Sequence, residues 1–495
     1  MFEAVEGALK KIDKKAFEKR EAKLRTHLLE MQYRILEAKS FPVVILINGV
    51  GASGKGETVN LLTEWMDPRH IRAHAVPEPT DEELQRPPMY RFWRKLPPKG
   101  SIGVFFGSWY TMPISEHVRG DAGTKRFEAS LAEIRRFETM LVREGALVVK
   151  YWFHLGKKDQ RKRLEDLSSH KKTAWQVTKE DWQDLDRCDE YRQTSERALS
   201  LTWSKEAPWT MVDARDAEAR TLFVGETLLS AMHDRLAESA DSAKKPEKPA
   251  TRKVTTKGSA KRLASVDLTG KLEKDEFNKE LVKWQRKLAL LTRHKKFQKL
   301  SPVLVFEGAD AAGKGGAIRR ITRALDARIY EVIPVAAPSD EERAQPYLWR
   351  FWRHAPRDGK LIIFDRSWYG RVLVERVEGF CATADWKRAY DEINDFEMQL
   401  TDAGCPIAKF WLQISPEEQL RRFKEREQIK WKQFKITQED WRNREKWDAY
   451  QIAASEMIEK TDTKHGPWTI VAAEDKNHAR IAVLKTVCES IERAL

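Results

Sequence analysis

The stretch "GADAAGKGG", Gly308–Gly316, lies between the apolar run "PVLVFE" and the segment "AIRRITRALD", whose apolar residues recur with helical spacing. A strand, a glycine-rich turn, Gly-Lys and a helix are typical of a phosphate site, because backbone N–H groups and the helix N-terminus face the anion. Lys314 would neutralise phosphate oxygens. An ordinary connection between a strand and a helix is the alternative interpretation, but the context of the motif favours phosphate binding.

The Ser or Thr that usually follows the lysine of such a loop and reaches Mg²⁺ is replaced by Gly315. Two carboxylates are candidates for that missing ligand. Asp310 lies inside the loop, and Asp365 ends the apolar run "LIIFD", where a second acidic metal ligand is expected. Oxygen ligands from neighbouring strand ends suit Mg²⁺. We therefore predict a Mg²⁺ site at Asp310 and Asp365; the alternative for Asp365 is a helix N-cap.

Phosphoryl transfer depends mainly on positive charge around the transferred group. Arg366 follows Asp365 directly, and Arg371 and Arg376 lie on the next segment. The segment "SPEEQLRRFKEREQ" begins with a capping box and predicts a basic helix, either a lid over the phosphates or a solvated helix. The predicted phosphate-binding residues are Gly308, Ala311, Ala312, Gly313, Lys314, Gly315, Gly316, Arg350, Arg353 and Arg376. The predicted lid bases are Arg421, Arg422, Lys424 and Arg426. The aromatic residues beside Arg350 and Arg353 are expected in the core: Trp349, Phe351 and Trp352.

A second copy of the loop, "GVGASGKGE", occupies Gly49–Glu57, and the two lysines are 314 − 55 = 259 positions apart. The motifs "RFWR", "SWY", "FE", "EDW" and "PWT" recur at the same offset, which indicates a duplicated domain. The predicted domains are an N-terminal copy over 1–238, a basic flexible linker over 239–265 and a C-terminal copy over 266–495. Apolar runs alternate with amphipathic segments, so each copy is expected to be a three-layer α/β domain with a parallel sheet.

The chain of 495 residues has a net charge of +14, which favours a polyanionic partner over a neutral one, although many Lys and Arg residues would simply solvate helix faces. No run of about 18 apolar residues predicts a membrane span. The N-terminus does not resemble a secretion signal, and the four cysteines lack metal-site spacing. We therefore expect a cytoplasmic protein without a membrane partner.

The C-terminal copy contains, in this order, "GADAAGKGG", "APSDEE", "WRFWRHAP", "FDRSWYGRVLVERV", "SPEEQLRRFKER" and "EDWRNREKWDAY". Together these motifs resemble the polyphosphate kinase-2 family, and the tandem arrangement resembles its class II members. The resemblance covers nearly all of residues 268–495 and, more weakly, most of 21–236. It implies a thymidylate kinase-like fold with a mobile lid, and Mg²⁺-dependent transfer of the terminal phosphate of inorganic polyphosphate to AMP, giving ADP. The predicted catalytic residues are Asp310, Lys314, Asp365, Arg366 and Arg371.

The N-terminal copy lacks the acidic residues of this site. At the offset of 259, Gly51 replaces Asp310 and Phe106 replaces Asp365, although Lys55 and the glycines remain. Two further arginines are lost: Gly107 stands for Arg366 and Met112 for Arg371. We therefore place the active site in the C-terminal copy. The N-terminal copy is expected to pair with it as an intramolecular pseudo-dimer and to guide polyphosphate, and the sequence leaves a homo-oligomer open.

Two rival functions remain open at this point. An ATP-dependent nucleoside monophosphate kinase would use a similar fold and similar residues. A nucleic-acid-binding protein would explain the net charge, but no recognition-helix, zinc-finger or RNA-binding motif is found, so no nucleic acid partner is expected. The sequence does not show how strictly AMP is preferred over GMP or other acceptors, nor the preferred polyphosphate length.

Overall fold

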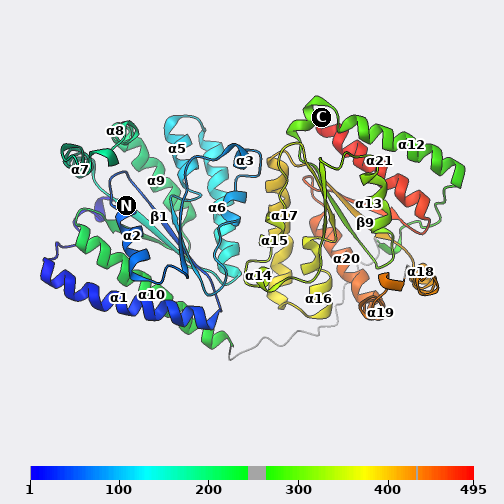
Figure 1. Ribbon diagram of the computed structural model, residues 1–495, viewed down its shortest axis with the longest axis horizontal. Helices are drawn as coiled ribbons and strands as arrows, with labels where there is room; N and C mark the ends of the chain where they lie inside the picture. Colours follow the sequence, from blue (N-terminus) through cyan, green and yellow to red (C-terminus); the bar gives the residue numbers. More distant parts are fainter. Residues whose placement is uncertain (1, 244–262, 431–432) are drawn as a thin grey trace. The chain divides into compact units, whose positions relative to one another are not determined.

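The computed structural model describes residues 2–243, 263–430 and 433–495. The chain forms two compact units, each built around its own parallel sheet (Figure 1). The central part of the predicted linker, 244–262, lies outside the described residues.

Each unit contains one short segment from the other sequence repeat. The units consist of these ranges: Met1–Glu78, Arg91–Pro246 and Ser339–Trp349 in unit 1, and Pro79–Tyr90, Glu247–Pro338 and Arg350–Leu495 in unit 2. Within unit 1, the Lys99 N–H donates to the Ala344 carbonyl at 2.8 Å. Within unit 2, the Asp358 N–H donates to the Gln85 carbonyl at 3.2 Å. The compact units therefore differ from the continuous repeats by these two segments.

The two sheets have the same topology. Unit 1 has the strand order β2-β3-β1-β4-β5, and unit 2 has the equivalent order β7-β8-β6-β9-β10, with every pair parallel. The strands are β1 Val43–Gly49, β2 Ile71–Ala75, β3 Ile102–Phe106, β4 Leu147–His154, β5 Trp209–Asp213, β6 Val303–Gly308, β7 Tyr330–Pro334, β8 Leu361–Asp365, β9 Ile407–Gln413 and β10 Trp468–Ala472. The central strands are apolar and buried on both faces, as parallel sheets require. The predicted α/β fold class is confirmed.

Helices cover both faces of each sheet (Figure 1). In unit 1, α1, α2 and α10 pack together on one face, and α5, α6 and α9 pack on the other. The helices of the first repeat are α1 Lys14–Ala38, α2 Lys55–Trp65, α3 Asp81–Leu84, α4 Tyr90–Trp93, α5 Thr111–Arg119, α6 Thr124–Arg143, α7 Lys157–Ser169, α8 Lys179–Asp186, α9 Cys188–Thr202 and α10 Ala217–Ala243.

The second repeat follows the same plan. In unit 2, α12, α13 and α21 cover one face of the sheet, and α17 and α20 cover the other. Its helices are α12 Lys274–Leu291, α13 Lys314–Thr322, α14 Asp340–Arg343, α15 Trp349–Trp352, α16 Val374–Glu378, α17 Thr383–Asp402, α18 Pro416–Gln428, α19 Gln438–Glu445, α20 Trp447–Thr461 and α21 Lys476–Ala494. Short 3-10 helices are η1 Phe2–Ala4, η2 Ala174–Gln176, η3 Lys295–Lys299, η4 Trp368–Arg371 and η5 Gln433–Lys435.

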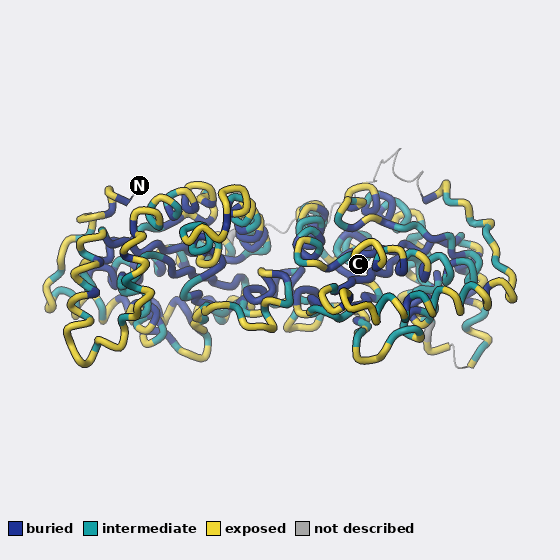
Figure 2. The backbone as a smooth tube through the Cα atoms, turned by 90° about the horizontal axis from the view of Figure 1, so that it is seen from above, coloured by how far each residue is buried: buried dark blue, intermediate teal, exposed yellow. Residues whose placement is uncertain are grey.

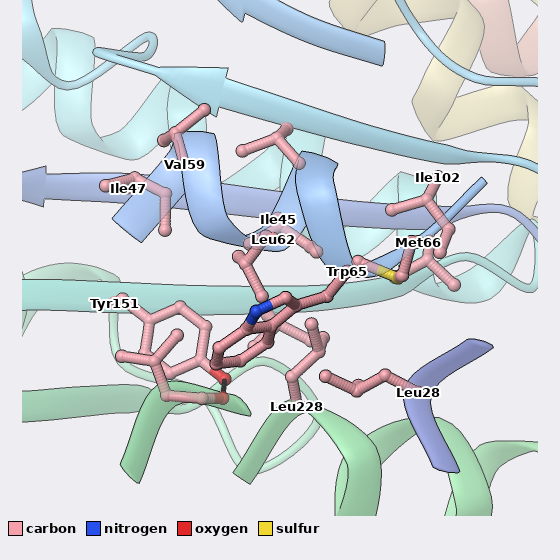
Figure 3. Packing of buried hydrophobic residues seen from close by; sticks show 14 of the residues in the cluster. Leu28, Ile45, Ile47, Val59, Leu62, Trp65, Met66, Ile102, Tyr151 and Leu228 are labelled. Atoms are coloured by element: carbon pink, nitrogen blue, oxygen red, sulfur yellow. Dashed lines mark hydrogen bonds between the residues drawn. The ribbon is translucent and has the colours of Figure 1, made fainter. Parts of the chain in front are cut away.

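The central strands of both sheets are almost wholly buried. Most exposed residues of the chain lie on helices and loops, and buried and exposed stretches alternate along the backbone (Figure 2). In unit 1, Trp65 of α2 packs among Leu62, Leu228 and Tyr151, which come from three different elements (Figure 3). The predicted core aromatics of the second repeat are all buried: Trp349, Phe351 and Trp352. Burying such side chains stabilises the fold by about 1.5–3 kcal/mol each.

A buried polar network occurs in both units and explains the repeated "SWY" and "FE" motifs. In unit 2, Lys409 Nζ donates to Glu397 Oε2 at 2.7 Å and to the Thr461 carbonyl at 2.7 Å. The Trp368 indole and the Tyr369 hydroxyl donate to Glu397 Oε1 at 3.0 and 2.6 Å. The equivalent network of unit 1 joins Trp109, Tyr110, Glu138, Lys150 and Thr202. These motifs therefore hold the scaffold rather than substrate.

In the described part of the chain, no helix combines the length and the apolar character needed to cross a membrane.

Candidate active site

The loop after β6 has the backbone of an anion site. Gly308 has a φ of +140° and Gly313 of +110°, and Ala311 lies in the left-handed region at +63°. A Cβ on Gly308 would lie 2.5 Å from the Leu412 carbonyl oxygen, so only glycine fits there. Lys314 Nζ donates to the Gly308 and Ala309 carbonyls at 2.6 and 3.2 Å. These bonds hold the ammonium group at the start of α13, beside the helix N-terminus.

The remaining loop positions leave room for a ligand. Ala312 is buried and lies in the core cluster below the loop. A Cβ on Gly315 would meet nothing within 4 Å, and one on Gly316 would come no nearer than 3.6 Å to Arg480 Nη2. The structure therefore has room for a Ser or Thr side chain at position 315, so crowding does not explain the glycine there.

Asp310 is held from two sides. Arg366 Nη2 donates to Asp310 Oδ1 at 3.0 Å, and Asn443 Nδ2 of α19 donates to Oδ2 at 2.9 Å. Arg366 has a φ of +62°, and its backbone N–H donates to the Phe306 carbonyl at 3.0 Å. Burial opposes the charge of Arg366, but attraction to Asp310 and Glu307 outweighs it and raises its pKa. The loop carboxylate and the arginine therefore form one fixed pair.

Asp365 lies at the same edge of the sheet as Asp310. It ends β8 opposite Phe306 of β6, and Asp310 follows Phe306 by four residues. The Asp365 carboxylate forms no hydrogen bond or ion pair with any residue that the structure describes. The two carboxylates predicted to bind metal thus lie beyond neighbouring parallel strands, one held by other side chains and one not.

A cavity of about 90 Å³ opens between this loop and helices α19 and α20. It is lined by Glu307, Gly308, Ala309, Asp310, Arg366, Gly370, Leu373, Val374, Trp411, Gln419, Asn443, Trp447, Tyr450 and Gln451. Its wall therefore combines the charged end of the sheet with apolar and aromatic side chains. Ligand sites commonly have this composition, with a few polar groups in a largely apolar wall.

Reasoning from the sequence missed several polar residues of this cavity, among them Glu307 and Asn443. Glu307 is buried and accepts a hydrogen bond from Ser367 Oγ at 2.8 Å; burial raises its pKa, while Ser367, Lys314 and Arg366 oppose the rise. The sequence feature that could have identified Glu307 is its position as an acidic residue within an otherwise apolar strand. Asn443 belongs to the motif "EDWRNREKWDAY", which entered only through the family resemblance.

Arg422 lies in a different place from that expected of a lid base. Its side chain is 3% exposed and makes hydrogen bonds to four carbonyls. Nη1 donates to Ala311 and Ala312 at 2.9 and 3.1 Å, and Nη2 donates to Ala473 and Glu474 at 2.7 and 2.8 Å. Through these hydrogen bonds, the buried Arg422 guanidinium joins the loop to the residues that follow β10. The other expected lid bases are partly or fully exposed on α18: Arg421, Lys424 and Arg426.

The other predicted arginines lie on the flanks of the site. Arg371 pairs with Glu375 at 2.9 Å. Arg376 pairs with Glu456 at 2.8 Å and lies over the Trp386 ring. Arg350 donates to the Ala336 carbonyl at 3.0 Å, and Arg353 is exposed. None of these four side chains lines the cavity. The structure thus brings the loop, Asp310, Asp365 and Arg366 to one edge of the sheet. Of these, Asp310 and Arg366 line the cavity, whereas Lys314, Asp365 and the four flanking arginines do not.

The carboxyl edge of the unit 1 sheet keeps the loop and loses its charged partners. Lys55 Nζ donates to the Gly49 carbonyl at 2.9 Å, as Lys314 does to Gly308 at 2.6 Å. Gly51 and Phe106 stand where unit 2 has its two carboxylates. An arrangement of this kind can hold an anion but offers no acidic metal ligand on the loop.

Comparison with known proteins identifies relatives along the whole chain. The family model of polyphosphate kinase 2 matches residues 11–240 and 271–495. A polyphosphate:AMP phosphotransferase of Pseudomonas aeruginosa is 49% identical over 494 residues, covering 100% of this chain and 99% of that protein. A polyphosphate:AMP phosphotransferase of Acinetobacter johnsonii is 36% identical over 478 residues, covering 95% and 96%. A crystal structure described as a polyphosphate kinase 2 from Pseudomonas aeruginosa has a TM-score of 0.90 at 48% identity and covers 100% of this chain and 99% of its own.

Proposed function

The chain belongs to the polyphosphate kinase 2 family, and from that membership we propose that it transfers the terminal phosphate of inorganic polyphosphate to AMP, giving ADP, in unit 2. The observation that carries this proposal is the fixed pair of Asp310 and Arg366 beside the Lys314 loop. This pair places a cation and a carboxylate where a phosphate on the loop would be transferred. The names of the full-length relatives supply the donor and acceptor.

Lys314 and Arg366 stabilise the negative charge that spreads over the transferred phosphoryl group. A phosphate oxygen of AMP attacks the terminal phosphorus, the bond to the bridging oxygen breaks, and a polyphosphate shorter by one unit leaves. Both substrates are polyanions, so these cations also reduce the repulsion between them. Arg422 supports this arrangement indirectly, because it fixes the Ala311 and Ala312 carbonyls of the loop. Arg371, Arg376 and the exposed bases of α18 are proposed to attract the donor chain.

A Mg²⁺ ion fits the residues at this edge. Asp365 offers a carboxylate that the described residues leave unbonded, and Asp310 offers a second one. No cluster of three or more metal-binding side chains occurs among the described residues. Two carboxylates suffice for Mg²⁺, which takes its other oxygens from water and phosphates and would supply charge neutralisation there.

We propose that the C-terminal copy, 266–495, catalyses phosphate transfer and that the N-terminal copy, 1–238, does not. The observation that supports this is the loss of both carboxylates in the first copy. We also propose that the two copies pair as an intramolecular pseudo-dimer, because they are duplicated domains with the same strand order. We also propose a cytoplasmic location, because all four cysteines are unpaired, as is usual in a reducing compartment.

The donor test separates this function from that of an ATP-dependent kinase. Purified full-length chain is given AMP and Mg²⁺ with either polyphosphate or ATP, and ADP is measured against time. We expect ADP with polyphosphate, and loss of at least about a hundredfold of that rate in Asp365→Ala, from which a charge-stabilising ligand is removed. ADP formation only with ATP would defeat the proposal.

A further inference from the structure

Unit 1 contains a cavity at the same edge of its sheet, although it lacks the catalytic carboxylates. The cavity measures about 370 Å³, against about 90 Å³ in unit 2. It opens between the Gly49–Gly51 stretch of the loop and helices α5, α8 and α9. Part of the extra space comes from one replacement, because Cys188 stands where unit 2 has Trp447. Unit 1, which lacks the catalytic carboxylates, therefore still has an open cavity at this edge, and its side chains do not fill that space.

The phosphate end of this cavity retains its backbone geometry. Gly49 has a φ of +138°, and Ala52 lies in the left-handed region at +54°, close to the values of Gly308 and Ala311. Lys55 is bonded to the loop carbonyls as Lys314 is. A left-handed alanine costs about 1–2 kcal/mol of backbone energy. The loop of unit 1 therefore keeps a costly conformation whose known use is to point N–H groups at an anion.

The loop and the strand ends of this cavity lack the acidic residues of unit 2, and Gly107 also replaces the cation Arg366. Each acidic residue of the unit 2 phosphate end is replaced by a neutral one: Glu307 by Asn48, Asp310 by Gly51 and Asp365 by Phe106. Lys55 remains as the cation on the loop. In unit 2 a metal ion is needed to bring phosphate oxygens beside carboxylates. In unit 1 the loop and the strand ends carry no carboxylate, so no metal ion is needed to bring a phosphate onto the loop; the nearby carboxylates are those of Asp181 and Asp184 on α8.

Buried donors in this cavity lack acceptors. Asn48 is 5% exposed; its Oδ1 accepts from Ser108 Oγ at 2.9 Å, but its Nδ2 has no acceptor among the described residues. Trp152 is 4% exposed, and its indole N–H is likewise without an acceptor in the described part of the chain. Both residues line the cavity. A buried donor left without an acceptor costs about 1–3 kcal/mol, so these groups indicate an acceptor-bearing ligand.

The α8 wall of the cavity suits an uncharged group with N–H or O–H donors. Asp181 and Asp184 of α8 line this wall, close enough to Lys55 for their charges to act on its pKa, and Asp184 stands where unit 2 has Asn443. The Asp184 carboxylate forms no hydrogen bond or ion pair with a described residue. Carboxylates here would repel a polyphosphate chain but would accept hydrogen bonds from ribose hydroxyls or a base amino group. The apolar side chains that line the cavity, among them Phe106, Ile114 and Trp152, offer a surface for a planar base.

We propose that the unit 1 cavity is a second, metal-independent site for a nucleoside phosphate, with the phosphate on the Lys55 loop and the nucleoside toward Asp184. This assignment replaces the expected guidance of polyphosphate by unit 1. The site holds its ligand without transferring phosphate, because the groups that would promote transfer are absent from its loop.

The test is equilibrium dialysis of labelled AMP with full-length Lys314→Ala in EDTA, so that neither the unit 2 lysine nor a metal ion contributes. We expect saturable binding of one AMP per chain. Adding Lys55→Ala should weaken this binding at least tenfold, and so should the nearly isosteric Asn48→Asp, which puts a carboxylate at the phosphate end. Asp184→Asn should weaken AMP several-fold while improving binding of tripolyphosphate. Thermal unfolding of every variant shows that each remains folded.

The proposal is overturned if Lys314→Ala binds no AMP under these conditions, or if neither Lys55→Ala nor Asn48→Asp changes the binding. It is also overturned if tripolyphosphate displaces AMP from the Lys55-dependent site at lower concentration than AMP itself, which would make the site one for polyphosphate. Since the assay contains no donor and no metal ion, its outcome is independent of the transfer proposed for unit 2.

Discussion

Arg366 carries a backbone cost that its counterpart avoids. It adopts a φ of +62°, and Gly107 occupies the equivalent position of unit 1 with a φ of +70°. A left-handed conformation costs a non-glycine residue about 1–2 kcal/mol, and glycine nothing comparable. Unit 2 therefore keeps an arginine at a position that favours glycine, as strained residues at functional sites often do.

Replacement of this residue should separate activity from stability. We expect Arg366→Gly to leave the thermal midpoint unchanged or to raise it, because backbone strain is relieved. The rate of ADP formation should fall at least about a hundredfold, because the charge beside Asp310 is lost. Thermal unfolding and initial rates measure the two effects. A large fall in the midpoint would show that Arg366 is structural, and Arg350→Gly, outside the cavity, is the control.

Lys55 gives the unit 1 site a pH dependence of its own. Loss of hydration lowers the pKa of Lys55 to about 8, although Asp181 and Asp184 partly oppose this. Burial raises the pKa values of Cys188 and Tyr191, which also line the cavity, and so opposes their ionisation. Only protonated Lys55 attracts phosphate. AMP binding in EDTA should thus be constant below pH 7.5 and weaken about tenfold per pH unit above 8.

This pH dependence is checked by dialysis from pH 6.5 to 9.5 with Lys314→Ala. Lys55→Arg is the matched control, because its guanidinium stays charged and its binding should hardly change with pH. A fall of the same size in both variants would assign the titration to another group.

At the scale of elements, α19 connects the loop carboxylate to the helices that cover the cavity. Asn443 is its contact with Asp310. A hydrogen bond to a charged group contributes about 1.5–3 kcal/mol, so Asn443→Ala should lower kcat about tenfold to a hundredfold. Asn443→Asp should cost more, since it sets a second carboxylate against Asp310. Steady-state rates measure both, and Gln438→Ala, exposed on the same helix, is the control. Unchanged kcat in Asn443→Asp would exclude this positioning role.

The buried network between α17 and β9 should contribute more to stability than any surface ion pair. Glu397→Ala leaves Lys409 buried without its carboxylate and should cost about 3–5 kcal/mol. Glu397→Gln keeps acceptors for Trp368 and Tyr369 and should cost less. Glu138→Ala makes the same change in unit 1 and should have a similar cost there. Hydrogen exchange measures each unit separately; a cost below about 1 kcal/mol would contradict the account.

The sequence predicted those parts of the site that are local in the chain. The loop, Lys314 and Asp365 each follow directly from a strand and its neighbours. Arg422 could not be placed in this way, because the carbonyls that it binds come from residues 311–312 and 473–474, far from it in the sequence. Its charge suggested a solvent-facing lid, whereas tertiary contacts bury it. Asn443 and Glu307 were missed because their roles depend on which elements meet at the sheet edge.

At the scale of the whole molecule, duplication has preserved a scaffold and changed the ends of its strands. Both sheets have one strand order, and both units keep the Lys–Glu network. The differences are concentrated at the carboxyl edge, where unit 2 has acidic residues and unit 1 neutral ones. The repeat was visible in the sequence through its constant offset. The exchange of short segments between the units was not, because it depends on which chain segments pack together.

The central claim is that unit 2 alone transfers phosphate from polyphosphate to AMP. The most direct test is the initial rate of ADP formation by full-length Lys314→Ala and Lys55→Ala at saturating AMP and polyphosphate. These variants remove the same group from equivalent loops. The account predicts a loss of at least about a hundredfold in Lys314→Ala and of less than about tenfold in Lys55→Ala. Comparable losses in the two variants would contradict it.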